Sequence, residues 1–353
     1  MIFWRSLVFF AFLLAAAPRD GAFFPAQAEA ARPDGQALRV ALLLDDDDGQ
    51  AWSTLLRSGL ARAEGEFPLR TEVLRASGQS QRTALFRKAA VEFELVLVGS
   101  ESFHEILRDN AANYRGTMFG CVDAGIRAPN IMCVAFADEQ AACLAGAAAA
   151  MLTARPGLPG INHEKILGWL TGEETPAQRN LLNGFVEGVR LVDAETRVMN
   201  GITGSFSTVG RAGEETRRLL GRGADVIVLA AGEGNSPALE IVRENGGYII
   251  RLDEEGASAL PERTLTSIVR RADKAAYEIV AAAASGRFRG KEIIVYNLEN
   301  RGVDITDVFN GAPALERWPL RDVRRRLEEL RREISSGGIG LNHLRARTLC
   351  DCL

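Results

Sequence analysis

The segment GADVIVLAAGEGN, residues 223–235, decides the fold of this chain. Its apolar run from Ala224 to Ala230 ends on small and polar residues, and helix-like sequence from Ser236 to Asn245 follows. A continuous apolar strand that leads into a helix is typical of a parallel sheet that is covered on both faces. The same succession recurs on both sides of this segment, and it predicts a doubly wound α/β architecture.

The succession of strands and helices divides into two units. The first unit has predicted strands and helices at Leu38–Leu44, Ala51–Glu64, Gln79–Val91, Glu94–Val98, Glu101–Ala112, Thr117–Val122 and Ile131–Phe136. The second has them at Asp138–Thr153, Lys165–Leu170, Pro176–Val192, Arg197–Ile202, Val209–Leu220, Ala224–Ala230, Ser236–Asn245 and Gly247–Leu252. Two units of this kind predict two Rossmann-like lobes with a cleft between them.

Composition and charge limit the class of protein. A chain of 353 residues with 47% hydrophobic side chains is long enough for two domains with substantial cores. Its 42 basic residues are balanced by 46 acidic residues. Because no excess of positive charge would attract a phosphate backbone, we expect no nucleic-acid partner.

The N-terminus predicts export. Arg5 precedes an uncharged apolar run from Ser6 to Ala17, which suits a signal peptide and is short for a transmembrane helix. An Ala-x-Ala site at residues 26–28 predicts a signal peptide over residues 1–28, and cleavage after Ala17 is the alternative. We expect a soluble periplasmic protein, with an uncleaved membrane anchor as the competing interpretation.

The five cysteines allow two interpretations. Cys121 and Cys133 lie in strand-like runs that could be neighbours, so either a disulfide or two buried thiols is compatible with the sequence. Cys143 lies in an alanine-rich helix and fits a buried thiol. Cys350 and Cys352 lack the spacing and the nearby histidines of a zinc site, so we expect no metal there.

The residues that follow each strand are the candidates for a binding site. Ligands of open α/β sheets bind outside the carboxyl ends of the strands. The acidic run from Asp45 to Asp48 either caps a helix or offers a ligand acceptor, with Asp45 the best placed. Asp138 is better explained as a helix cap than as a ligand contact. The other residues at strand ends are Gly99, Ser100, Asp123, Gly232 and Glu233.

A series of short motifs then resembles one family. Counting back from Gly59 places Trp52 and Ser53 where that family has Phe-Asn at the start of its first helix. The later motifs are APN at 128–130, Phe136–Glu139, LAG at 144–146, GSF at 204–206, LTSIVRRADKAAYE at 265–278 and SGGIGL at 336–341. From Leu38 to Leu341 the chain therefore resembles the basic membrane protein family of exported binding proteins, relatives of purine nucleoside receptors that supply ABC transporters.

The resemblance implies a fold, a ligand and a set of contacts. The fold is that of a type I periplasmic binding protein, with lobe 1 at residues 37–136 and 268–294, lobe 2 at 137–267 and 295–341, and a tail at 342–353. Trp52 and Phe206 would stack on a purine from opposite lobes, and Asp253 would accept from the ribose. Arg270 stands where the family has lysine, and a guanidinium is a planar fork rather than a point donor. The resemblance also implies an ABC permease as the partner, and it implies that the protein is a monomer and needs no cofactor.

Three other interpretations remain open. Arg270 and the missing asparagine after Trp52 could indicate a carboxylated or sugar-like cargo. The chain could also be a sensory module that presents its closed form to a kinase or chemoreceptor. The fold would also suit an intracellular regulator, although the signal-like N-terminus argues against that location. Because the three histidines are scattered and neither a nucleophile elbow nor a phosphate-binding loop is present, we expect no enzymatic activity.

Overall fold

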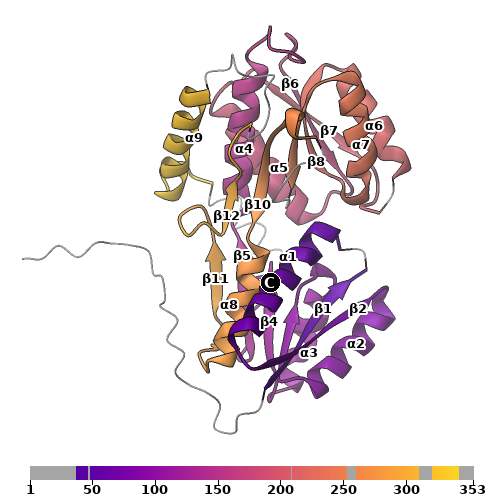
Figure 1. Cartoon of the computed structure of the whole chain (residues 1–353), viewed down its shortest axis with the longest axis vertical. Helices are drawn as coiled ribbons and strands as arrows, with labels where there is room; N and C mark the ends of the chain where they lie inside the picture. The colour runs from indigo at the N-terminus through magenta and orange to yellow at the C-terminus, as the bar shows by residue number, and fades with distance from the viewer. Residues whose placement is uncertain (1–36, 47, 208, 253–259, 310–319, 342–353) are drawn as a thin grey trace, which may run out of the picture.

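The computed structural model describes residues 37–46, 48–207, 209–252, 260–309 and 320–341. Two six-stranded sheets form two lobes, which lie one above the other in Figure 1. The predicted doubly wound α/β fold of two lobes is confirmed. No helix within the described ranges has the length and the apolar character needed to cross a bilayer.

Lobe 1 contains a fully parallel sheet in the order β11-β5-β4-β3-β1-β2. Its strands are β1 (Leu38–Asp45), β2 (Leu69–Ala76), β3 (Leu95–Val98), β4 (Met118–Val122), β5 (Ile131–Phe136) and β11 (Ile293–Tyr296). Its helices are α1 (Gln50–Glu66), α2 (Gln79–Glu92), α3 (His104–Asn110) and α8 (Ala272–Ala284).

Lobe 2 contains a sheet in the order β12-β10-β9-β8-β6-β7, in which β12 pairs antiparallel to β10. Its strands are β6 (Ile166–Thr171), β7 (Arg197–Ile202), β8 (Ala224–Ala230), β9 (Tyr248–Leu252), β10 (Thr264–Arg270) and β12 (Val303–Ile305). Its helices are α4 (Asp138–Thr153), α5 (Pro176–Arg190), α6 (Gly210–Gly221), α7 (Asn235–Asn245) and α9 (Leu320–Ser335).

The central strands are buried on both faces, as their continuous apolar sequence predicts. Along β1, Leu42 and Leu44 belong to one core, whereas Ala41 and Leu43 belong to the core on the opposite face of the sheet. This alternation follows from the period of two in a strand. The first of these cores continues through α4 into lobe 2, so the lobes share buried apolar surface.

Strand β2 is the element that the sequence pattern did not predict. It lies at the edge of the lobe 1 sheet, and Arg70 and Glu72 on it are exposed. Its sequence, LRTEVLRA, therefore lacks the apolar run that marks the central strands. An edge strand with charged side chains also resists pairing with other chains.

The chain passes between the lobes three times. It leaves lobe 1 after β5, returns between β10 and α8, and leaves again between β11 and β12, as the orange α8 beside the indigo α1 shows (Figure 1). The sequence placed the second and third passages near Ile268 and Val295. In the structure the two passages begin close to these positions, because β10 extends to Arg270 in lobe 2 and β11 extends to Tyr296 in lobe 1.

Hydrogen bonds join the three passages into a hinge. The Ala137 amide donates to the Tyr296 carbonyl at 2.7 Å, and the Arg271 amide donates to the Gly302 carbonyl at 2.9 Å. The third passage approaches Tyr296 so closely that a Cβ on Gly302 would lie 2.2 Å from the Tyr296 Cβ. The hinge is therefore a set of mutually bonded strands, and not three independent linkers.

Candidate functional site

Trp52 marks the carboxyl edge of the lobe 1 sheet. It lies in the first turn of α1, and its indole Nε1 donates to the Gly99 carbonyl, which follows β3, at 2.8 Å. Its ring meets Phe136, at the end of β5, edge-to-face at a centroid distance of 6.0 Å. The indole is partly exposed, and it contacts the ends of two strands, β3 and β5, between which β4 lies.

Arg270 reaches the same place from lobe 2. Its guanidinium carbon lies 4.4 Å from the centroid of the Trp52 ring, which is a cation–π contact. Its Nη1 donates to Asp123 Oδ2 at 3.0 Å and lies 3.8 Å from Asp138 Oδ2. Only 12% of the Arg270 side chain is exposed. This arginine, the last residue of β10, therefore docks into lobe 1.

Acidic groups outnumber the cation around Arg270. Asp123 has φ 66°, in the left-handed region that Asp tolerates better than most residues, and its carboxylate meets Arg270. Burial raises the pKa of the Glu101 carboxyl, the negative charge of Asp123 raises it further, and Arg270 opposes the shift. Asp123 and Asp138 lie within ion-pair distance of the guanidinium, and the Glu101 carboxyl is near enough to interact with it electrostatically.

Asp45 and Ser100 lie deeper in lobe 1 than the sequence prediction implies. The Asp45 carboxylate accepts from Arg82 and, at 2.8 Å, from Ser102 Oγ, and the residue is 1% exposed. Ser100 Oγ accepts from the Asp45 amide at 2.8 Å. These groups form the base on which the loop before α1 rests, and a role of Asp45 and Ser100 in ligand binding stays a prediction.

Ser53 and Asp48 also take part in internal contacts. Ser53 is 5% exposed, and its Oγ accepts from Arg75 Nη2 at 3.3 Å. Asp48 Oδ2 accepts from the Asp45 amide at 2.8 Å and from Ser100 Oγ. Burial raises the pKa of the Asp48 carboxyl. The acidic loop is thus held by contacts within lobe 1, directly before α1, which carries Trp52.

In lobe 2, a second group of predicted residues gathers around Phe206. The Phe206 carbonyl accepts from the Glu233 amide at 2.8 Å, and Gly232 lies against the same carbonyl with φ 62°. The Phe206 ring is partly exposed and packs against Gly172, which follows β6. The loops after β6, β7 and β8 therefore hold one aromatic side chain at the carboxyl edge of this sheet.

The predicted residues thus form two groups, one in each lobe. Trp52, Gly99, Asp123 and Arg270 are together in the first group, above Asp45, Ser53 and Ser100; Phe206, Gly232 and Glu233 form the second. Among the described residues, no ring contact joins Phe206 to Trp52. Asp253 lies outside the residues that the structure describes.

Several residues of these groups were absent from the prediction. Gly172 directly follows β6 and lies two residues after the predicted strand Lys165–Leu170, so the rule of strand ends could have found it. Phe136 was predicted as the end of a strand and as part of a motif, but not as a contact of Trp52. Arg82 lies in the first turn of α2, and no local signal in the sequence indicates that it meets Asp45.

The two nearby cysteines are free thiols in this structure. Cys121 and Cys133 occupy paired positions on β4 and β5, and both are buried. A hydrogen bond from the Cys121 thiol lowers the pKa of Cys133, whereas burial raises the pKa of Cys121. Within the described residues, no group of three or more His, Cys, Asp or Glu side chains could hold a metal ion.

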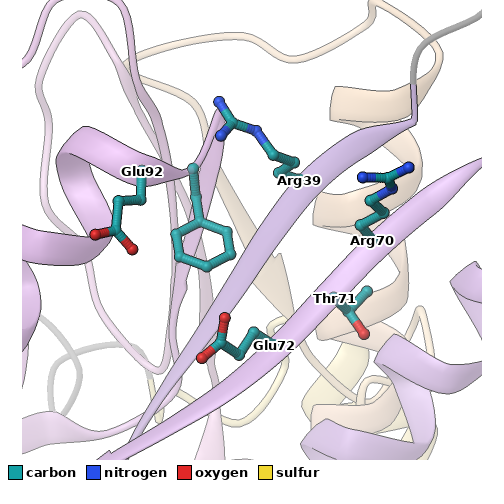
Figure 2. Close-up of a pocket in the computed structure, with 6 residues that line it drawn as sticks. Arg39, Arg70, Thr71, Glu72 and Glu92 are labelled. Carbon is teal, nitrogen blue, oxygen red and sulfur yellow. The ribbon is translucent and has the colours of Figure 1, made fainter.

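A cavity of about 370 Å³ lies elsewhere on lobe 1 (Figure 2). Its lining comes from the amino-terminal parts of β1 and β2 and from the end of α2: Arg39, Arg70, Thr71, Glu72, Glu92 and Phe93. Arg39 is already paired with Glu94 at 2.6 Å. Since ligands of open α/β sheets bind at the opposite, carboxyl ends of the strands, this cavity is not the candidate site.

Two known proteins are similar in sequence to this chain. The chain is 23% identical over 269 residues to Basic membrane protein A of Borreliella burgdorferi, and this alignment covers 74% of this chain and 77% of that protein. It is 25% identical over 213 residues to the ABC transporter nucleoside-binding protein BmpA of Lactococcus lactis subsp. cremoris, covering 55% of this chain and 58% of that protein.

A solved structure shares the fold. The solute-binding protein of an ABC transporter system from Aeropyrum pernix K1 superposes with a TM-score of 0.72 at 21% identity, covering 88% of this chain and 98% of that chain. The profile of the Bmp family, described as ABC transporter substrate-binding protein PnrA-like, matches residues 37–325. The chain therefore belongs to the Bmp family of ABC transporter substrate-binding proteins and has the two-lobed fold of a type I periplasmic binding protein.

Proposed function

We propose that this protein is exported, binds a purine nucleoside or a related nucleobase compound between its lobes, and delivers it as a monomer to an ABC permease. The observation that carries the proposal is one partly exposed aromatic side chain at the carboxyl edge of each sheet, Trp52 in lobe 1 and Phe206 in lobe 2. Two aromatic faces on opposite lobes suit a flat ring that is enclosed when the lobes close.

The charges around Arg270 favour a neutral ligand. Asp123 and Asp138 already compensate the positive charge of its guanidinium. The Glu101 carboxyl lies close enough to interact electrostatically with Asp123 and Arg270. An added carboxylate or phosphate would meet this acidic surrounding, which would repel it. The carboxylated cargo that Arg270 alone suggests is therefore the weaker of the two alternatives.

Calorimetry on ligand-free protein tests the proposal. The protein is unfolded in guanidinium, dialysed to remove bound compounds, refolded, and titrated with purine and pyrimidine nucleosides, free bases, ribose and nucleoside monophosphates. We expect purine nucleosides to bind and the monophosphates to bind more weakly. If no nucleoside or base binds the refolded protein, the proposal is wrong.

Matched variants then test the two aromatic contacts. Stacking of a base on an aromatic side chain contributes about 1–3 kcal/mol, so we expect Trp52→Ala and Phe206→Ala each to weaken binding by about 5- to 150-fold. Phe67→Ala is the control, because Phe67 is a partly buried aromatic at the other end of α1. Equal losses in all three variants would contradict direct stacking.

A further inference from the structure

Phe206 is held by the loops of three neighbouring strands. In the lobe 2 sheet β6 lies between β8 and β7, so Gly172, Phe206 and Gly232 follow strands that are adjacent in space. The Gly204 amide donates to the Gly172 carbonyl at 2.7 Å, which joins the loop after β7 to the loop after β6. The Glu233 amide donates to the Phe206 carbonyl at 2.8 Å, which joins the loop after β8 to the loop after β7.

Gly172 touches the aromatic ring itself. A Cβ built on Gly172 would lie 2.5 Å from Phe206 Cδ1, 2.7 Å from Cγ and 2.8 Å from the Phe206 amide nitrogen. Separations below 3.0 Å are essentially never seen for a Cβ, and here both ring and backbone are in the way. Any side chain at position 172 would therefore move the ring, the backbone, or both.

Gly232 restricts the backbone of Phe206. A Cβ on Gly232 would lie 2.4 Å from the Phe206 carbonyl oxygen and 3.1 Å from its Cβ. Gly232 also has φ 62°, a conformation that glycine adopts without strain. Two glycines thus define the place of Phe206, one through its ring and one through its carbonyl group.

We propose that Gly172 and Gly232 are positioning residues that hold the Phe206 ring in place for a flat heteroaromatic ligand before that ligand binds. This inference rests on the proposed function for its ligand, but the position of the ring in the free protein is independent of any ligand. A ring that is already in place loses less conformational entropy on binding, so its stacking energy contributes more fully to affinity.

The first test needs no ligand. The protein is labelled with 4-fluorophenylalanine, and the Phe206 resonance is assigned by its disappearance in Phe206→Leu. We expect Gly172→Ala to shift or broaden that fluorine resonance, whereas Gly210→Ala should leave it unchanged, because a Cβ on Gly210 meets nothing within 4 Å. An unchanged resonance in a folded Gly172→Ala protein would overturn the proposal, even if no nucleoside binds.

The second test is a double-mutant cycle on affinity, with an adenosine or inosine titration of the wild type, Gly172→Ala, Phe206→Ala and the double variant. Because stacking on one aromatic side chain is worth about 5- to 150-fold, we expect Gly172→Ala to weaken binding by no more than Phe206→Ala does. In the Phe206→Ala protein, Gly172→Ala should then have little further effect. A loss of the same size in both backgrounds would show that Gly172 acts otherwise than through Phe206.

Unfolding curves keep the two tests interpretable. If Gly172→Ala lowers the midpoint of unfolding but the protein remains folded at the temperature of measurement, both experiments still test the proposal. Should Gly172→Ala fail to fold, Gly232→Ala provides the same comparison through the carbonyl of Phe206. In that case, an unchanged Phe206 resonance in Gly232→Ala would be the result against the proposal.

Discussion

The contact between Arg270 and Trp52 predicts a measurable coupling between the lobes. Arg270 ends β10 of lobe 2, and Trp52 begins α1 of lobe 1. The guanidinium lies 4.4 Å from the ring centroid, and the Arg270 side chain is 12% exposed. Cation–π contacts contribute about 0.5–1 kcal/mol at exposed sites and about 2 kcal/mol when desolvated. Because the guanidinium is largely shielded from water and the indole is partly exposed, we expect a coupling between these limits, of about 1–2 kcal/mol.

A double-mutant cycle isolates that coupling from the other contacts of the two residues. Arg270→Met also removes the ion pair with Asp123, and Trp52→Leu also removes the hydrogen bond to Gly99. Each of these losses occurs in both arms of the cycle and cancels, so the remainder belongs to the pair. The free energy of unfolding in urea is followed by circular dichroism, since loss of Trp52 changes the fluorescence signal.

The result that would refute this reasoning is a coupling below about 0.3 kcal/mol, which is within the usual additivity of independent sites. Asp123→Asn is the control, because it removes a charge next to Arg270 and leaves the aromatic ring in place. In the Asp123→Asn protein, the coupling between Arg270 and Trp52 should persist. Its disappearance there would mean that the carboxylate, and not the ring, holds the guanidinium.

Three further predictions concern stability and reactivity. Burial raises the pKa of Asp225 from 3.8 to about 6. Between these two pH values the folded protein keeps a proton that the unfolded chain has lost. The free energy of unfolding should therefore fall by about 3 kcal/mol as the pH rises from 3.8 to about 6. Urea titrations across this range should show that Asp225→Asn removes the slope, and an unchanged slope would locate its source elsewhere. A Cβ on Gly59 would lie 2.0 Å from the Asp273 carbonyl oxygen; Gly59→Ala should thus destabilise the protein by about 1–3 kcal/mol in denaturant titrations. Gly65→Ala on the same helix, which meets nothing within 4 Å, should be neutral or gain up to about 1 kcal/mol, so equal losses would count against this interpretation. Burial raises the pKa of the Cys143 thiol to about 12, so iodoacetamide near neutral pH should alkylate it in urea but not in the folded protein, as peptide mass spectrometry can check; alkylation in the folded protein would show that α4 opens.

The sequence predicts what is encoded locally. Central strands such as β8 are continuous apolar runs because both faces are covered, and each ends on residues that reach the edge of the sheet. That logic placed Asp123 at a strand end, and the family resemblance placed Trp52 at a helix start and Phe206 after a strand, where the structure has them. Strand β2 escaped prediction because one edge strand needs little apolar sequence.

Contacts between distant segments were beyond the reach of the sequence. Asp45 looked like an exposed acceptor, but Arg82 from α2 meets its carboxylate and the residue is 1% exposed. Arg270 looked like a free ligand-binding cation, whereas Asp123 compensates its charge from the other lobe. In both cases tertiary structure determines which side chain becomes the ion-pair partner. No local sequence pattern around either residue therefore predicts that partner.

The interleaved lobes also constrain the order in which the chain can fold as it is made. Five of the six lobe 1 strands are complete by Phe136, but β11 and the covering helix α8 come only after residue 271. A chain emerging from the ribosome thus presents an unfinished first lobe while the second lobe is still being synthesised. Lobe 1 can close its sheet only after Tyr296 has been added, so neither lobe is a contiguous unit that a simple truncation could isolate.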